Sequence, residues 1–281
     1  MSTAGPQQFN SRILDTVGFQ DAERYSSYLK TLAGRLRCDL AWENLRGFLP
    51  DDRRHRRVLD LGGGTGSTSL RLARKNFQVV LLDSSQEMLG VARKAAEAHG
   101  VATRIFFRSA DAAQVSELFE AQPFDIVVCH NLLEYVADPV VIVNGIAEVM
   151  EKDAVVSVLV RNRAGEVLKA AIKSGDWGLA RGNLSAATAV DSLFGQPVRL
   201  FDPKDVLDML TRTGFQVVAQ YGVRVFSDYL HPKEPTGEAA YRQLLELELS
   251  LGMRPEFAAV ARYTQWIARR SSASRRKGSA Q

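Results

Sequence analysis

The sequence predicts an α/β fold with a mostly parallel sheet, preceded by a helical extension and carrying a cap inserted late in the chain. Short apolar runs alternate with helical patterns, the first run ends in a cluster of glycines, and a helical segment precedes that run. Alternating strands and helices form right-handed crossovers that cover a parallel sheet on both faces. Ligands of such sheets bind beyond the carboxyl ends of the strands, where we expect the functional site.

The composition fits a single soluble core with additions. The 281 residues are 46% hydrophobic and 24% charged, which suffices to bury a large core. Because the sequence has neither an apolar run of 18 residues nor a signal-peptide pattern, we expect a cytoplasmic protein without a membrane segment. Cys38 and Cys129 lie far apart without metal-ligand spacing, so we expect no disulfide and no metal site.

Three parts of the chain are expected to differ in character. A helical extension or lid occupies residues 1–52, the core occupies 53–268 with the cap at about 161–201, and a basic flexible tail occupies 269–281. Much of the net charge of +4 comes from the arginines between residues 53 and 57 and from that tail. Basic runs attract acidic partners, but they also suit a solvated linker and a frayed end.

The extension has a helical pattern from residue 13 to residue 49. Leu36, Leu40, Trp42 and Leu45 are spaced to form one apolar face, and a proline followed by two aspartates breaks the pattern. This face predicts that the extension packs against the core.

The core alternates strands with helices. Strands are expected at 57–61, 78–83, 103–108, 124–130 and 154–160, and helices at 67–75, 86–99, 113–119 and 138–150. Residues 161–201 have weak periodicity and several glycines, which is typical of an irregular or partly helical insertion. This insertion is the expected cap.

The end of the chain completes the sheet. Asp202 as N-cap and Pro203 in the first turn predict a helix to residue 212, which Gly214 closes. A strand at 215–220, a polar and aromatic segment at 222–230, a helix at 239–251 and a final strand at 262–268 follow.

The glycine-rich turn after the first strand, VLDLGGGTG at 58–66, predicts a small-molecule site. A dinucleotide loop requires GxGxxG, but the frames that start at Gly62 and Gly64 end on serines, and the loop lacks the lysine of a P-loop. Asp60 lies two residues before the first of these glycines and suits a ligand with positive charge. S-adenosylmethionine carries a sulfonium and an ammonium group, so we expect it to bind here, against Gly62, Gly63, Gly64 and Gly66.

Polar residues also end the next three strands. Asp83 is placed to accept the hydroxyls of a ribose, unless it caps a helix, a task that a neighbouring serine can take. Asp111 suits an adenine amino group or, equally, another helix cap. His130 ends the fourth strand beside the glycine turn. We also include the adjoining Ser84, Met88 and Ala112 in the expected cofactor site.

These motifs together resemble those of the class I methyltransferases. The matching segments are VLDLGGGTG, the acidic end of the second strand, SAD after the third, and FDIVVCHNLLEYVADP. The resemblance implies a Rossmann-like, seven-stranded sheet whose last strand is antiparallel. It also implies S-adenosylmethionine as cofactor and S-adenosylhomocysteine as product.

A closer resemblance extends over nearly the whole chain. It is to the bacterial tRNA 5-carboxymethoxyuridine carboxyl methyltransferases and rests on GRLR at 34–37 with Trp42, ADP at 137–139, GVRVFSDYL at 222–230, LLELE at 244–248 and residues 252–263. It implies a tRNA acceptor and a cofactor site formed by Arg37, Gly62, Gly63, Asp83, Ala110, Asp111 and His130. The family carries a lysine-rich stretch in the cap where this chain has residues 181–194, so its basic surface is thinner here.

Methyl transfer from a sulfonium is an in-line displacement that requires neither a covalent nucleophile nor, for an ionised carboxylate, a general base. Because a guanidinium grips a carboxylate with two hydrogen bonds, Arg224 is expected to hold such an acceptor, unless it pairs with Asp228. Tyr229 is expected to add a hydrogen bond to that carboxylate. Arg161 and Asn162, at the end of the fifth strand, are expected to lie near the same entrance of the site.

Two other functions stay open at this point. A small-molecule O- or N-methyltransferase, acting on a small anionic metabolite, would use the same cofactor site. A non-catalytic S-adenosylmethionine-binding subunit is disfavoured by the intact loop. We expect a monomer or a homodimer.

Overall fold

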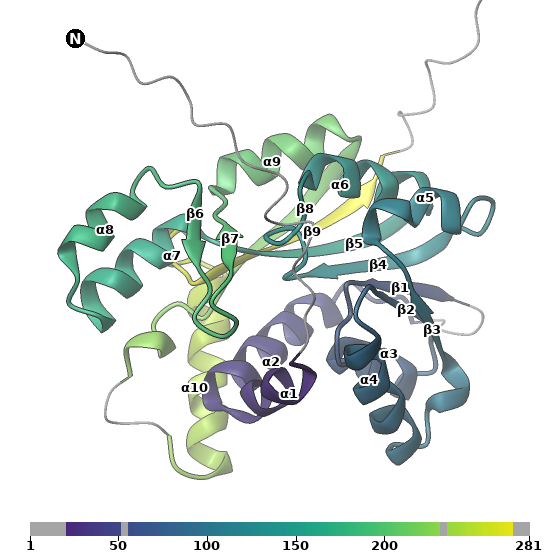
Figure 1. The fold of residues 1–281 in the computed structure, drawn as a ribbon, viewed down its shortest axis with the longest axis horizontal. Coiled ribbons are helices and arrows are strands. Elements are labelled where there is room, and N and C mark those ends of the chain that lie inside the picture. The colour runs from purple at the N-terminus through teal and green to yellow at the C-terminus, as the bar shows by residue number, and fades with distance from the viewer. Residues whose placement is uncertain (1–20, 52–55, 231–234, 272–281) are drawn as a thin grey trace, which may run out of the picture.

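A seven-stranded sheet runs through the centre of the computed structural model, which describes residues 21–51, 56–230 and 235–271 (Figure 1). The strand order is β3-β2-β1-β4-β5-β9-β8, in which β1 to β5 pair in parallel and β9 is antiparallel to both β5 and β8. This arrangement confirms the predicted Rossmann-like class I methyltransferase fold. The strands are β1 (Arg57–Leu61), β2 (Gln78–Asp83), β3 (Ile105–Ser109), β4 (Phe124–His130), β5 (Met150–Arg161), β8 (Phe215–Val223) and β9 (Tyr263–Arg270).

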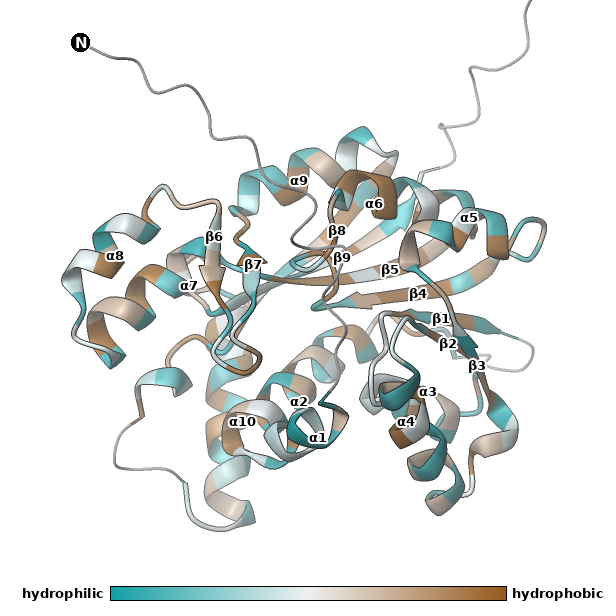
Figure 2. Cartoon of the chain, viewed as in Figure 1, coloured by the Kyte–Doolittle hydropathy of each residue, from teal (hydrophilic) through white to brown (hydrophobic). Residues whose placement is uncertain are grey.

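Helices cover both faces of the sheet because the strands are apolar on both sides (Figures 1 and 2). One face carries α2 (Leu32–Arg46), α3 (Ser67–Arg74), α4 (Gln86–Ala98) and α10 (Glu238–Gly252). The other carries α5 (Val115–Leu118), α6 (Pro139–Glu148) and α9 (Pro203–Arg212). Shorter turns are η2 (Ala102–Arg104), η3 (Ala112–Gln114), η5 (Ser227–Tyr229) and α11 (Pro255–Ala258). The apolar core therefore forms two layers, one on each side of the sheet.

The described part of the N-terminal extension forms two helices, in line with its helical pattern. Helix α1 (Ala22–Lys30) ends at Thr31, whose extended backbone begins α2 and whose Oγ1 accepts from the backbone N–H of Gly34. Gly34 is needed for the turn, since a Cβ there would lie 2.1 Å from the carbonyl oxygen of Tyr28. The apolar face of α2 is buried as expected, with Leu36 and Leu45 fully inaccessible.

The cap follows β5 and lies at one end of the sheet, at the left of Figure 1. It contains α7 (Arg163–Leu168), a π-helical turn (η4, Lys169–Lys173), α8 (Trp177–Asn183) and the antiparallel pair β6 (Thr188–Val190) and β7 (Pro197–Arg199). The last residues of the cap are hydrogen-bonded to its first residues, because the backbone N–H of Phe201 donates to the carbonyl oxygen of Arg161. The segment is therefore more regular than its weak periodicity indicated.

Several predicted boundaries were wrong by a few residues. Strand β5 begins at Met150 rather than Ala154, so α6 ends earlier. Strand β9 continues to Arg270, and Arg269 and Arg270, which we assigned to the tail, pair with β5 and β8. Asp202 occupies the N-cap position of α9, but its side chain makes no capping hydrogen bond and lies 3.4 Å from Nε of Arg163.

Parts of three expectations lie outside the described residues. They are the helical pattern before residue 21, the arginines at 53 and 54, and the tail beyond residue 271. No helix of the described chain is long and apolar enough to cross a membrane.

Candidate functional site

A cavity of about 840 Å³ opens beside the carboxyl ends of β1, β2 and β4. This volume lies within the range of sites for small molecules and cofactors. Nine of the expected cofactor residues line the cavity, namely Arg37, Gly62, Gly64, Asp83, Ser84, Met88, Asp111, Ala112 and His130. Asp60 and Gly63 line a small adjoining cavity, whereas Gly66 and Ala110 line neither.

The glycine turn joins β1 to α3 and is held from behind by Asp60. The Asp60 carboxylate is buried and accepts a hydrogen bond of 2.6 Å from Oγ of Ser69 in α3. Burial raises the pKa of Asp60 to about 6, even though the bond from Ser69 opposes this shift. Gly66 adopts a φ of +79° at the N-cap of α3, a conformation that favours glycine. Asp60 thus supports the turn in addition to any effect on a cationic ligand.

Asp83 faces the cavity from the end of β2. Its Oδ1 accepts from the backbone N–H of Ser85 at 2.9 Å, and its Oδ2 accepts from that of Gly64 at 2.8 Å. Ser85, not Asp83, provides the side-chain cap of α4. Each carboxylate oxygen has a further lone pair, so the group can still accept the hydroxyls of a ribose.

Asp111 serves the alternative role that the sequence left open. Its Oδ1 accepts from the backbone N–H of Ala113 at 2.8 Å and caps η3. The residue is nevertheless exposed and lines the cavity, so its second oxygen can take a ligand.

His130 is a neutral imidazole in the cavity wall. Its Nε2 lies 2.7 Å from Oγ of Ser157, and burial together with Arg37 lowers its pKa to about 3. A neutral ring at physiological pH can orient a ligand without adding charge.

Arg37 connects the extension to the cavity. Its Nη1 donates to Oδ1 of Asn131 at 2.9 Å and its Nη2 to the hydroxyl of Tyr25 at 2.8 Å. The guanidinium is buried, and these two hydrogen-bond partners are neutral groups. Such a guanidinium suits a carboxylate ligand, as S-adenosylmethionine has in its amino-acid part.

Arg37 is also one of four arginines that surround the buried Tyr263. The Cζ atoms of Arg37, Arg161, Arg224 and Arg262 each lie 5.9 Å from the centroid of the Tyr263 ring. We call these four residues the arginine cluster. Burial raises the pKa of Tyr263, but the four guanidiniums outweigh this effect and lower it to about 8. The potential at the Tyr263 hydroxyl is therefore strongly positive.

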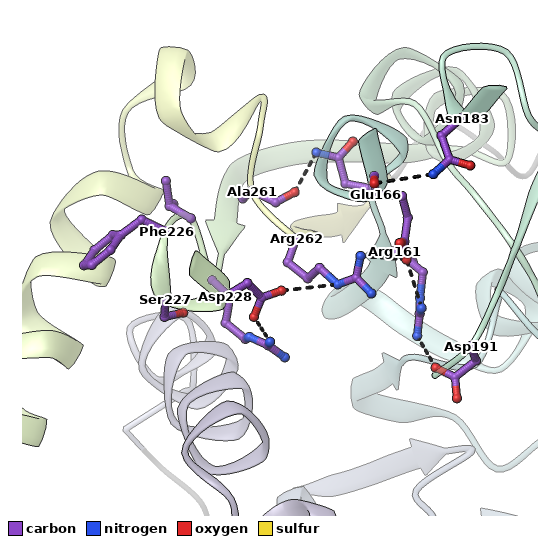
Figure 3. Close-up of polar contacts among 12 residues, drawn as sticks. Arg161, Glu166, Asn183, Asp191, Phe226, Ser227, Asp228, Ala261 and Arg262 are labelled. Atoms are coloured by element: carbon purple, nitrogen blue, oxygen red, sulfur yellow. Dashed lines mark hydrogen bonds and ion pairs between the residues drawn. The ribbon is translucent and has the colours of Figure 1, made fainter. Parts of the chain in front are cut away.

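Three buried carboxylates pair with members of the cluster (Figure 3). Arg161 donates to Glu166 at 3.0 Å and to Asp191 at 2.6 Å. Arg224 forms an ion pair with Asp228, whose other oxygen lies 3.5 Å from Nε of Arg262. Nη1 of Arg262 also lies 2.7 Å from Glu166, although it is not aligned for a hydrogen bond.

The structure places the predicted substrate residues apart from the large cavity. Arg224, with a φ of +61°, pairs with Asp228, which is the alternative that the sequence left open. Asn162 caps α7, and its amide donates to two backbone carbonyl oxygens. Tyr229 lies on η5 and Arg161 is paired as described, so none of the four lines the cavity. Their direct contact with an acceptor stays a prediction.

Sequence reasoning missed several residues of this region. The cavity is also lined by Tyr25, Asn131, Tyr135 and Phe194. The other missed residues are Arg262, a member of the arginine cluster, and Tyr263, which the cluster surrounds. Within the motif FDIVVCHNLLEYVADP, Asn131 and Tyr135 are signals that could have been used. Among the described residues, no group of three or more His, Cys, Asp or Glu side chains could hold a metal ion.

Comparisons with known proteins agree with this site. Residues 52–188 match the family described as "Methyltransferase domain". The tRNA 5-carboxymethoxyuridine methyltransferase of Escherichia coli (strain K12) is 31% identical over 260 residues, 89% of this chain and 94% of that protein. The ubiquinone biosynthesis O-methyltransferase of Actinobacillus pleuropneumoniae (serotype 5b) is 30% identical over 63% of this chain and 74% of its own length.

The solved structure of the CcbJ methyltransferase from Streptomyces caelestis shares the fold. Its TM-score is 0.61 at 17% sequence identity, and the likeness covers 91% of this chain and 98% of that one. The match to the E. coli protein extends through the whole core and confirms the family that the motifs indicated. The chain therefore belongs to the class I S-adenosylmethionine-dependent methyltransferases, with S-adenosylmethionine as its cofactor.

Proposed function

We propose that the chain methylates the carboxylate of a 5-carboxymethoxyuridine residue in tRNA. The observation that carries this proposal is the arginine cluster around Tyr263, whose positive potential lowers the pKa of a buried phenol to about 8. Arg37 belongs to both the cluster and the cavity wall, so the potential of the cluster extends to an anionic acceptor that enters beside the cofactor. The match to the E. coli enzyme along nearly its full length supports the same acceptor.

The residues that line the large cavity divide into two groups under this proposal. Asp83 would hold the ribose of the cofactor, Asp111 its adenine, and Arg37 its carboxylate, with Gly62 and Gly64 allowing close approach. S-adenosylmethionine supplies an activated methyl group on a positively charged sulfur. Tyr135 and Phe194 line the rest of the cavity, where the acceptor would enter.

The chain has little chemistry to perform beyond alignment. An acceptor carboxylate is ionised at neutral pH, so its oxygen attacks the methyl carbon without losing a proton. The carbon–sulfur bond breaks, and the products are a methyl ester and S-adenosylhomocysteine. The protein positions the oxygen and excludes water, effects that contribute up to about 7 to 11 kcal/mol when alignment is good.

The pairing of Arg161, Arg224 and Arg262 with carboxylates sets the strength of this potential. Three buried acids pair directly with Arg161, Arg224 and Arg262, and a fourth, Glu134, interacts with Arg161 and Arg37, so the acids moderate the positive field. A stronger positive field would lower the nucleophilicity of a bound carboxylate. The cluster therefore suits an acceptor that must be held and must still react.

The acceptor is tested by supplying purified protein with labelled S-adenosylmethionine and three acceptors. They are tRNA that contains 5-carboxymethoxyuridine, the same tRNA without that modification, and a small-metabolite extract. The proposal predicts label in the modified tRNA alone. Label confined to the extract would favour the small-molecule O-methyltransferase instead, a function to which the partial match with the ubiquinone enzyme points.

A further inference from the structure

Two aromatic rings meet at the cavity from parts of the chain that are distant in sequence. Tyr25 lies on α1 in the extension, and Phe194 lies between β6 and β7 in the cap. Both residues line the cavity. Their ring centroids are 6.2 Å apart, and their planes are inclined by only 24°. The proposed cofactor contacts use neither ring face.

Buried guanidiniums hold both rings in place. The carboxylate of Asp191 accepts from Arg161 at 2.6 Å through Oδ1, and through Oδ2 from the backbone N–H groups of Leu193 and Phe194 at 2.9 Å each. The turn that carries Phe194 is thus anchored to the end of β5. Tyr25 is fixed in a similar way, because its hydroxyl accepts from Arg37 at 2.8 Å.

The two rings stack directly on each other, so a third ring requires them to part. Aromatic carbons pack at about 3.5 Å, so a planar ring between two others separates them by about 7 Å. The observed 6.2 Å is near the upper limit for direct aromatic pairs. A flat ring would enter between them only when the two side chains separate until each lies about 3.5 Å from it.

We infer that Tyr25 and Phe194 form a clamp that holds the planar base of the acceptor at the entrance of the cavity. The inference rests on the proposed function, under which that ring is the modified uracil. Enzymes that act on a base in RNA take it out of its stack, and aromatic side chains replace the lost stacking. The neighbouring arginine cluster then attracts the carboxylate that the same base carries.

The clamp is tested with Phe194→Ala, Phe194→Trp and, as a matched control, Val190→Ala, an exposed position on the same hairpin. In full-length protein, Phe194→Ala should raise KM for modified tRNA by about 5- to 100-fold, the range expected for one lost stacking contact. Phe194→Trp and Val190→Ala should stay near wild type. Calorimetry should give wild-type affinity for S-adenosylmethionine in all three variants.

An unchanged KM in Phe194→Ala would overturn the clamp while leaving the proposed function intact. The clamp would also be overturned if weaker binding of S-adenosylmethionine explained the whole rise in KM. If the wild-type protein methylates no tRNA, the proposed function fails and a second measurement decides the clamp. The extra indole emission of Phe194→Trp over wild type should be quenched by the nucleoside 5-carboxymethoxyuridine in the presence of S-adenosylhomocysteine. Absence of quenching there would refute the inference.

Discussion

At the scale of single residues, burial shifts the pKa values of the acids in the site, and the buried arginines shift the pKa values of their neighbours. The carboxylates of Asp60 and Asp83 have raised pKa values because burial disfavours their charged form. The arginines stay charged and instead change their neighbours, lowering the pKa of Tyr263 to about 8 and that of His130 to about 3, the latter with burial as the larger cause. The site thus combines the neutral imidazole of His130 with the charged guanidinium of Arg37 in one cavity wall.

Replacing Asp83 by alanine should weaken S-adenosylmethionine binding by about 1 to 3 kcal/mol, because charge-assisted hydrogen bonds to the ribose are lost. Asp83→Asn, which keeps one acceptor oxygen, should lose less. Calorimetric titration of both variants measures the effect, and thermal unfolding shows whether the turn at Gly64 remains folded. Wild-type affinity in Asp83→Ala would remove this residue from the cofactor site.

The lowered pKa of Tyr263 predicts a pH dependence of acceptor binding. Above about pH 8 the phenol ionises and neutralises part of the arginine cluster, so KM for an anionic acceptor should rise as pH increases through this value. Tyr263→Phe should abolish that rise. The same shift from 10.0 to about 8 stabilises the fold fully above pH 10, and this contribution is lost as pH falls through 8. A KM profile that is flat in wild type, or identical in the two proteins, would contradict this assignment.

The sequence predicted which residues meet at the cavity wherever their place at the end of a strand determines their position. Asp83 and His130 end parallel strands, whose carboxyl ends share one edge, so their meeting at one cavity could be foreseen. The pairing of Arg224 with Asp228 was left open because local sequence allows both a free and a paired guanidinium. The contact of Tyr25 with Phe194 depends on how the extension and the cap pack, which periodicity does not encode.

At the scale of elements, the extension and the cap each supply a wall of the cavity. Helix α1 contributes Tyr25, α2 contributes Arg37, and the hairpin between β6 and β7 contributes Phe194. Because Trp42 and Leu45 of α2 are part of the core, removing residues 1–45 would damage the core as well as the proposed lid. Point variants at the junction of α1 and α2 are therefore the appropriate test of the lid.

Gly34→Ala should displace α1, since the new Cβ would lie 2.1 Å from the carbonyl oxygen of Tyr28. We expect a loss of stability of about 1 to 3 kcal/mol and weaker cofactor binding, as Tyr25 no longer supports Arg37. Gly90→Ala in α4 is the control, because nothing lies within 4 Å of its Cβ position and alanine favours a helix by about 1 kcal/mol. Equal melting temperatures and affinities in the two variants would refute the lid.

At the scale of the whole molecule, the parallel part of the sheet follows from the alternation of apolar runs and helical patterns, whereas the antiparallel last strand was implied by the resemblance to the class I methyltransferases. That alternation predicts crossovers between parallel strands, and the structure confirms the parallel pairing of β1 to β5. The extent of β9 was underestimated because Arg269 and Arg270 look like part of a basic tail, yet their backbones pair with β5 and β8. Composition describes side chains, whereas strand pairing is made by the backbone.

The proposed function requires that the arginine cluster and the S-adenosylmethionine site together direct methyl transfer to one carboxylate of the acceptor. The most direct measurement is the chemical identity of the methylated nucleoside formed on modified tRNA. After digestion, the label should reside on 5-carboxymethoxyuridine as a methyl ester and should be released by mild alkali, while tRNA treated with Asp83→Ala should carry far less label. Alkali-stable label on a base or ribose, or no label in tRNA at all, would contradict carboxyl methylation as the function of this protein.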